Sequence, residues 1–150
     1  MDYEFLIEDL NLNKSQKSIG TDKGLAKIGD AIVNLSYSVA KSSFLTKNKA
    51  NNKPVRTGKK VGRNILEAAL KKADLKHFAK NRANAHDLAD TVEALVAYVW
   101  LSKNLTLKEI IDLLTENLAG NLYNRQEEIN NATIAFTELL NNIKKFLPDK

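Results

Sequence analysis

One acidic residue stands alone in a long apolar and basic stretch of the sequence. Asp30 is the only Asp or Glu between Lys23 and Arg63. Around it, apolar residues recur at steps of three and four, a spacing that predicts one buried helical face made of Leu25, Ile28, Ile32, Leu35 and Val39. A carboxylate beside such a face is costly unless a cation or hydrogen-bond donors meet it. The preceding Gly29 favours close approach by another part of the chain. The alternative is an acid at the edge of the stripe that points to water.

A second stretch carries two further acids at a helical spacing. Asp90 and Glu93 are three residues apart, so they are neighbours on one helix face. Residues 94–101 are all apolar or aromatic, which predicts a largely buried helix. Two acids there repel each other unless a cation lies between them, and Mg²⁺ prefers carboxylate oxygens. Asp30, Asp90 and Glu93 would form a site for one metal ion if the two helices cross. The alternative is an ordinary exposed pair of acids.

Both stretches are similar to motifs of one known family. Residues 25–32 (LAKIGDAI) resemble the signature helix of the ribonuclease III family, and residues 89–97 (ADTVEALVA) resemble its second acidic motif, in matching order. The resemblance covers about residues 20–118. It implies an all-α, ribonuclease III-like endonuclease domain, usually a homodimer, that cuts double-stranded RNA with Mg²⁺, for which Mn²⁺ is a possible substitute. It further implies that Asp30, Asp90 and Glu93 bind the metal, and that Asp30 and Glu93 are catalytic.

The sequence departs from the family pattern at three positions. Ala26 stands where the full-length bacterial pattern has a metal-binding Glu, and Lys23 replaces another Glu. Lys27 replaces an aromatic residue that helps the family's dimer to pack. Short family members without a separate RNA-binding domain are similar to this chain in having a small residue at the Ala26 position. The missing acid favours an alternative, a non-catalytic double-stranded-RNA-binding or ribosome-assembly protein on the same fold.

The positive charge is concentrated in one part of the chain. Residues 41–82 contain 13 Lys or Arg against two acids, a net charge of +11, whereas the whole chain carries +5. Residues 47–60 are rich in Asn and Lys, contain Pro54 and Gly58 and have no acid, which predicts a loop free to contact phosphates. We expect RNA contacts from Lys53, Arg56, Lys59, Lys60, Arg63, Lys80 and Arg82. The alternative is a solvated loop that keeps the protein in solution.

Charged residues just before the second acidic motif have alternative roles. Lys80 and Arg82 either hold the substrate or balance the nearby acids. His86 lies four residues before Asp90, which favours a simple pair between them over a catalytic role. Asp87 lies one turn before Asp90 and is a further candidate ligand, though a weaker one.

The elements that must position these residues are all predicted to be helices. We expect a short helix over 2–12, a polar connection over 13–20, and helices over about 22–44, 61–73, 84–102, 107–118 and 122–147. Thr21 or Asp22 would cap the second helix, and Thr106 with Glu109 forms a capping box. Tyr98 and Trp100 are predicted to be core or dimer-interface aromatics. The last helix has no counterpart in the family pattern, so it either covers the core or builds an oligomer interface.

Composition restricts the class of protein and of site. A chain of 150 residues with 43% hydrophobic content predicts one domain, 1–150. The absence of cysteine excludes disulfides and thiolate sites, and two histidines are too few for a histidine cage. No apolar run has membrane-spanning length, and the first residues lack a signal-peptide pattern, so we expect a cytoplasmic location. Without a double-stranded-RNA-binding domain, the nuclease domain would have to bind its substrate itself.

Overall fold

The protein is all-α, as predicted. The computed structural model describes residues 2–12, 14–49, 51 and 53–150, and these ranges contain helices and no strand. The helices are α1 (Glu8–Leu12), α2 (Gln16–Gly20), α3 (Lys23–Lys47), α4 (Arg63–Lys72), α5 (Ala85–Leu101), α6 (Leu107–Glu116) and α7 (Arg125–Ile143). Short 3₁₀ turns span Glu4–Ile7, Lys76–Phe78 and Lys144–Phe146. Over the described ranges, none of these helices combines the length and apolar character that a bilayer crossing requires.

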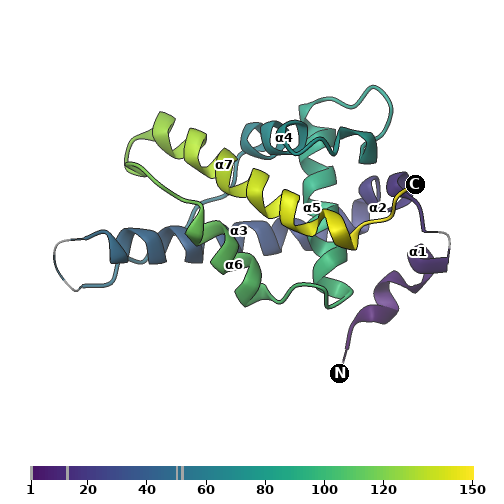
Figure 1. The fold of residues 1–150 in the computed structure, drawn as a ribbon, viewed down its shortest axis with the longest axis horizontal. Helices are drawn as coiled ribbons and strands as arrows, with labels where there is room; N and C mark the ends of the chain where they lie inside the picture. Colours follow the sequence, from purple (N-terminus) through teal and green to yellow (C-terminus); the bar gives the residue numbers. More distant parts are fainter. Residues whose placement is uncertain (1, 13, 50, 52) are drawn as a thin grey trace.

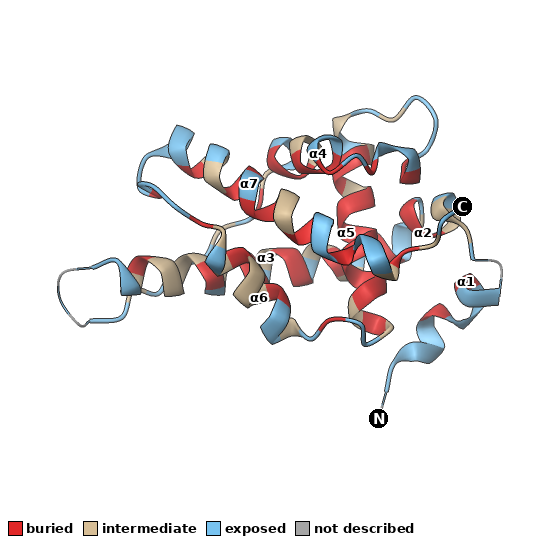
Figure 2. Cartoon of the chain, in the orientation of Figure 1, coloured by how far each residue is buried: buried red, intermediate tan, exposed pale blue. Residues whose placement is uncertain are grey.

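Two crossing helices, α3 and α5, form the centre of the fold (Figure 1). Residues 91–99 of α5 are all buried, as expected for its apolar sequence. Helices α4 and α7 pack against each other, α4 also packs on α5, and α6 packs on both α3 and α7. The buried residues lie along α5 and on the sides of α3, α4 and α7 that face the interior, while the C-terminal end of α3 extends beyond this core (Figure 2).

The prediction that the large apolar residues of α3 form one buried face is partly wrong. Leu35 and Val39 are 51% and 42% exposed, whereas Leu25 and Ile32 are buried and Ile28 is half-buried. The face that packs inward instead includes small residues, namely Ala26, Gly29, Ser36 and Ala40. Small side chains let α3 approach its neighbours closely, so the helix is rotated away from the orientation that the large apolar residues indicate.

The other predicted elements differ mainly at the N-terminus. Helix α2 lies within the predicted polar connection, where Ser15 caps it in a capping box with Ser18; residue 13 of that connection lies outside the described residues. Along the first predicted helix, Ile7 and Leu10 are buried, but Phe5, Leu6 and Leu12 are exposed. The caps at Asp22 and Thr106 are confirmed, the latter with Glu109 at the third position of its helix.

A buried ion cluster joins α7 to α3 and to the following loop. The Glu128 carboxylate on α7 accepts hydrogen bonds from Tyr37 Oη at 2.8 Å, and its two oxygens lie 2.7 Å from Lys41 Nζ and Lys59 Nζ. Burial alone would raise the pKa of Glu128, but these three donors outweigh it and hold the pKa below its usual range. Burial and the bond to Glu128 also raise the pKa of Tyr37.

Replacing Glu128 is expected to destabilise the fold strongly. The substitution Glu128→Ala would leave the half-buried Lys41 without its carboxylate, so the free energy of unfolding should fall by about 3 kcal/mol. Because the folded pKa lies below the unfolded value near 4.5, this contribution is present above that pH and disappears as pH falls through the folded pKa. Urea unfolding at neutral and acidic pH would show the difference between the variants shrinking on acidification.

A surface carboxylate provides the matched control. Glu67 forms an exposed pair with Lys71 one turn along α4 at 2.8 Å, so Glu67→Ala should cost less than about 0.5 kcal/mol. Equal losses for the two variants would contradict a special role for the buried cluster.

Candidate active site

The two sequence motifs meet where α3 crosses α5. A Cβ at Gly29 would overlap the backbone carbonyl of Glu93, so only glycine permits this approach of the helices. The close approach expected at Gly29 is therefore present, and the chain segment that it admits is the second acidic motif. Asp30, the next residue on α3, is thereby placed beside Glu93.

Asp30 and Glu93 form a coupled pair of carboxyl groups. Glu93 is only 9% exposed, and burial together with a side-chain hydrogen bond to Asp30 raises its pKa to about 8. Asn34 Nδ2 donates a hydrogen bond to Asp30 Oδ1 at 3.1 Å and so orients this carboxylate. A hard cation that accepts carboxylate oxygens fits this donor set.

The third predicted ligand, Asp90, faces a different partner. Its Oδ2 lies 2.9 Å from Lys23 Nζ, and this hydrogen bond raises the pKa of the lysine. His86 Nε2 lies 3.8 Å from the same oxygen, which agrees with the predicted pair. Within the described ranges, no three acidic or histidine side chains converge closely enough to hold a metal ion. The predicted trio thus divides into the pair Asp30–Glu93 and the ion pair Asp90–Lys23.

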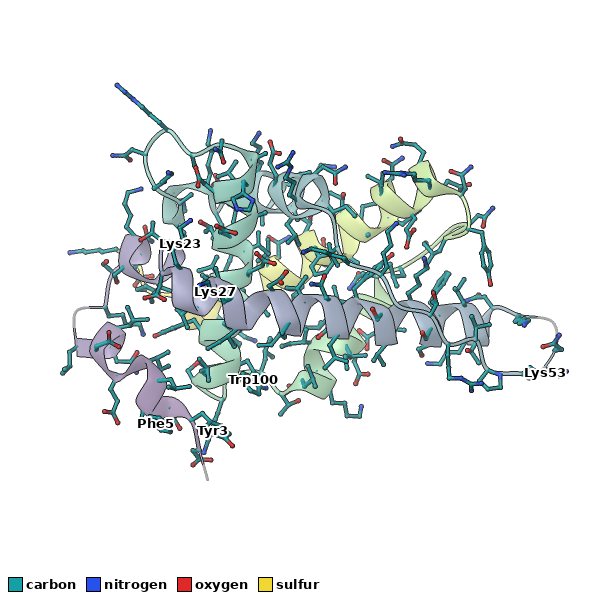
Figure 3. The ribbon with its side chains drawn as sticks, turned by 180° about the vertical axis from the view of Figure 1, so that it is seen from behind. Tyr3, Phe5, Lys23, Lys27, Lys53 and Trp100 are labelled. Carbon is teal, nitrogen blue, oxygen red and sulfur yellow. The ribbon has the colours of Figure 1, made fainter. Side chains whose placement is uncertain are left out.

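These groups line one open cavity of about 790 Å³. Its wall combines the three acids with basic side chains from α3, α4, α5 and the segment before α4, namely Lys23, Lys27, Lys60, Arg63 and His86. Figure 3 shows Lys23 and Lys27 together near the N-terminal end of α3. An anion entering this cavity would meet cations at its edges before it reached the carboxyl pair.

The predicted RNA-binding residues occupy different places. Lys60 and Arg63 line the cavity, and Arg56 is exposed on the loop that leads to it. Lys59 instead pairs with the buried Glu128. Lys53 lies at the opposite end of the molecule from Lys23 (Figure 3).

Two of the remaining charged residues near the start of α5, Lys80 and Asp87, have structural partners. Lys80 Nζ lies 3.3 Å from Asp87 Oδ2, which agrees with the balancing role considered above, and Arg82 is exposed. Asp87 belongs to the capping box of α5, where its Oδ2 accepts a hydrogen bond from the backbone N–H of Asn84. That hydrogen bond is the main reason that the pKa of Asp87 lies below its usual range. Asp87 therefore serves as a helix cap in this structure.

Sequence reasoning did not include Lys23 and Lys27 among the site residues. They lie seven and three residues before Asp30 on α3, a spacing that puts all three on one side of the helix. That spacing was the signal that could have assigned them to the cavity.

Comparison with known proteins agrees with the two motifs. A family model described as Ribonuclease III matches residues 23–148. The matched region begins with α3, contains both acidic motifs and includes α7, the helix for which the motifs alone offered no counterpart. No curated protein matches the chain in sequence.

Proposed function

Since the chain belongs to the ribonuclease III family, we propose that it is an Mg²⁺-dependent endoribonuclease that hydrolyses phosphodiester bonds of double-stranded RNA, with Mn²⁺ as a possible substitute. The observation that carries this proposal is the coupled carboxyl pair Asp30–Glu93, which lies in a cavity with cationic edges. RNA processing is the class of reaction that this site would serve.

Each group of the cavity has a role in the proposed reaction. Asp30 and Glu93 would hold the metal ion, and Asp90 would join them when Lys23 moves away. The bound ion would lower the pKa of a water molecule and neutralise charge on the phosphate. Asn34 keeps Asp30 oriented toward the cavity. Basic side chains at the edges would bind the phosphates on either side of the cleaved bond, and these are Lys27, Lys60 and Arg63.

The proposed substrate is an RNA duplex recognised mainly by its backbone. Side chains cannot read the deep and narrow groove of A-form RNA, so the contacts would be to phosphates and to the shape of the duplex. Each neutralised phosphate releases counterions, and binding should weaken as salt increases. We therefore expect little dependence on RNA sequence.

We further propose that two copies of the chain act together. Ala31, Leu35 and Val39 are spaced by four residues and are exposed on one side of α3, where they form an apolar stripe on the helix that carries Asp30. A second copy that covers this stripe with its own would bring two active sites into one homodimer. Such a dimer would cut both strands of the duplex.

Two observations favour the alternative of a non-catalytic double-stranded-RNA-binding or ribosome-assembly protein. Ala26 brings no acid to the cavity, and Asp90 is ion-paired with Lys23 rather than grouped with the other two carboxylates. Such a protein would bind the duplex without cutting it.

Incubation of the purified protein with labelled duplex RNA and Mg²⁺ tests the proposal. Cleavage of duplex RNA, with single-stranded RNA and duplex DNA left intact and with no reaction in EDTA, is the expected result. Binding without cleavage in both Mg²⁺ and Mn²⁺ would identify the non-catalytic alternative. A protein that neither bound nor cut the duplex would contradict both functions.

Replacing Lys23 is expected to strengthen metal binding. In Lys23→Met the ammonium group that pairs with Asp90 is lost, so this carboxylate becomes available to a divalent cation. An exposed ion pair is worth at most about 1 kcal/mol, which corresponds to an increase in Mg²⁺ affinity of at most about fivefold. Calorimetric titration with Mg²⁺ measures this affinity directly. Lys27→Met, one turn along the same cavity wall, controls for the loss of charge alone, and an unchanged or lower affinity in Lys23→Met would contradict this role.

A further inference from the structure

The loop after α3 returns along that helix in an unusually regular way. Four polar side chains of α3, spaced by four residues, accept hydrogen bonds from alternate backbone N–H groups of residues 55–61, which we call the strap. The bonds are Val55 N to Thr46 Oγ1 at 2.8 Å, Thr57 N to Ser42 Oγ at 3.0 Å, Lys59 N to Ser38 Oγ at 3.0 Å and Val61 N to Asn34 Oδ1 at 2.7 Å. The strap is thus bound to α3 along its whole length.

The geometry of the helix and of the strap explains why these four hydrogen bonds, which we call the ladder, stay in register. Four residues of α-helix rise about 6.0 Å, and two residues of extended chain span about 6.6 Å. The two repeats match closely enough for four successive bonds. The Ser42 hydroxyl also donates a hydrogen bond to the carbonyl oxygen of Thr57 at 2.9 Å, so this position is held in both directions.

The ladder separates the basic residues of the strap into two groups. Positions with bonded N–H groups are half-buried or buried, and Lys59, one of them, reaches the buried Glu128. The alternate residues Arg56 and Lys60 are exposed. Since side chains alternate along an extended chain, these two lie on the same outer side, about 13 Å apart. Lys60 also lines the active-site cavity, so the outer row leads into it.

We propose that the strap is a rigid phosphate-binding element, in which Arg56 and Lys60 bind two different phosphates of the RNA duplex that enters the cavity. Asn34, Ser38, Ser42 and Thr46 are its positioning residues. The inference rests on the proposed function for the identity of the ligand. It differs from the prediction of a generally basic loop, because it excludes Lys59 from RNA contact and assigns a role to uncharged residues of α3.

Salt-dependent binding of duplex RNA in EDTA tests the charged residues without involving cleavage. Arg56→Ala and Lys60→Ala should each weaken binding several-fold and reduce the slope of log K against log salt by about 0.7–0.9, the effect of one lost phosphate contact. Lys72→Ala, an exposed charge at the end of α4, is the control and should leave the slope unchanged. Slopes that stay at the parent value in both strap variants, or that fall equally in the control, would overturn the proposal.

The outcomes separate this inference from the proposed function. A protein that binds RNA with the expected slopes but does not cut it supports the strap and refutes the nuclease. A protein that cuts RNA with unchanged slopes refutes the strap alone. A parent protein that does not bind duplex RNA refutes both.

A second variant tests the ladder without a change in charge. Ser42→Ala removes the acceptor for Thr57, so that amide should exchange hydrogen faster and RNA binding in EDTA should weaken several-fold. Ser42→Thr keeps the hydroxyl and should restore both properties, whereas Ser43→Ala, next along the helix, should change neither. Faster exchange at Thr57 with RNA binding equal to the parent would overturn the positioning role.

Discussion

The substitutions Asp30→Asn and Glu93→Gln are each expected to reduce cleavage of duplex RNA by about a thousandfold, equivalent to about 4 kcal/mol of transition-state stabilisation. Each variant retains the size of the side chain but removes one of the two carboxylates that would hold the metal ion. Because Glu93 is buried and its carboxyl group already shares a hydrogen bond with Asp30, the amide should be accommodated without loss of the fold. Single-turnover cleavage in Mg²⁺ measures the effect.

Two controls distinguish this loss from a general defect. Binding of duplex RNA in EDTA should equal that of the parent, since the basic side chains are unchanged. Asp87→Asn alters a carboxylate one turn away that caps α5, and it should retain activity within a few-fold. If Asp87→Asn lost as much activity as Glu93→Gln, the metal site would not be centred on Asp30 and Glu93.

Gly29→Ala is expected to give the largest loss of stability of any single methyl addition to α3. The new Cβ would overlap the backbone carbonyl of Glu93, which has no alternative rotamer to adopt, so α3 and α5 would have to separate. We expect the free energy of unfolding to fall by about 3 kcal/mol. Cleavage should also fall, because the shift changes the distance between Asp30 and Glu93. Urea unfolding and the cleavage assay measure the two effects.

The same substitution at another glycine of α3 is the control. At Gly24, which is exposed in the first turn, the added Cβ would meet only the Asp22 side chain at 3.2 Å. Alanine has the higher helix propensity, so Gly24→Ala should change stability by less than about 1 kcal/mol in either direction. A Gly29→Ala variant as stable as Gly24→Ala would contradict the close crossing of the two helices.

The crossing that builds the site could be predicted because its signals are local. Gly29 beside a lone acid, and two acids before an apolar run, indicate a close contact near a carboxylate without any knowledge of the fold. The caps at Asp22 and Thr106 were predictable for the same reason, since each depends on a few neighbouring residues. Helix α2 was missed because five mainly polar residues carry no hydrophobic period.

The features that could not be predicted depend on contacts between distant residues. The orientation of α3 follows from which side chains fit inside the fold, and small residues, not Leu35 and Val39, lie on its buried face. The ion pair of Asp90 with Lys23 joins two helices, so no spacing within either one indicates it. Lys59 and Arg56 look alike in the basic loop, and only the ladder along α3 shows that one faces inward and the other outward.

The most direct test of the account is to locate a bound metal ion by anomalous diffraction from crystals grown with Mn²⁺. We predict one strong anomalous peak in contact with carboxylate oxygens of both Asp30 and Glu93, and its loss in crystals of Glu93→Gln. Mn²⁺ bound elsewhere on the protein, or no peak at the crossing of α3 and α5 in crystals of an active preparation, would contradict the assignment of this carboxyl pair as the metal site.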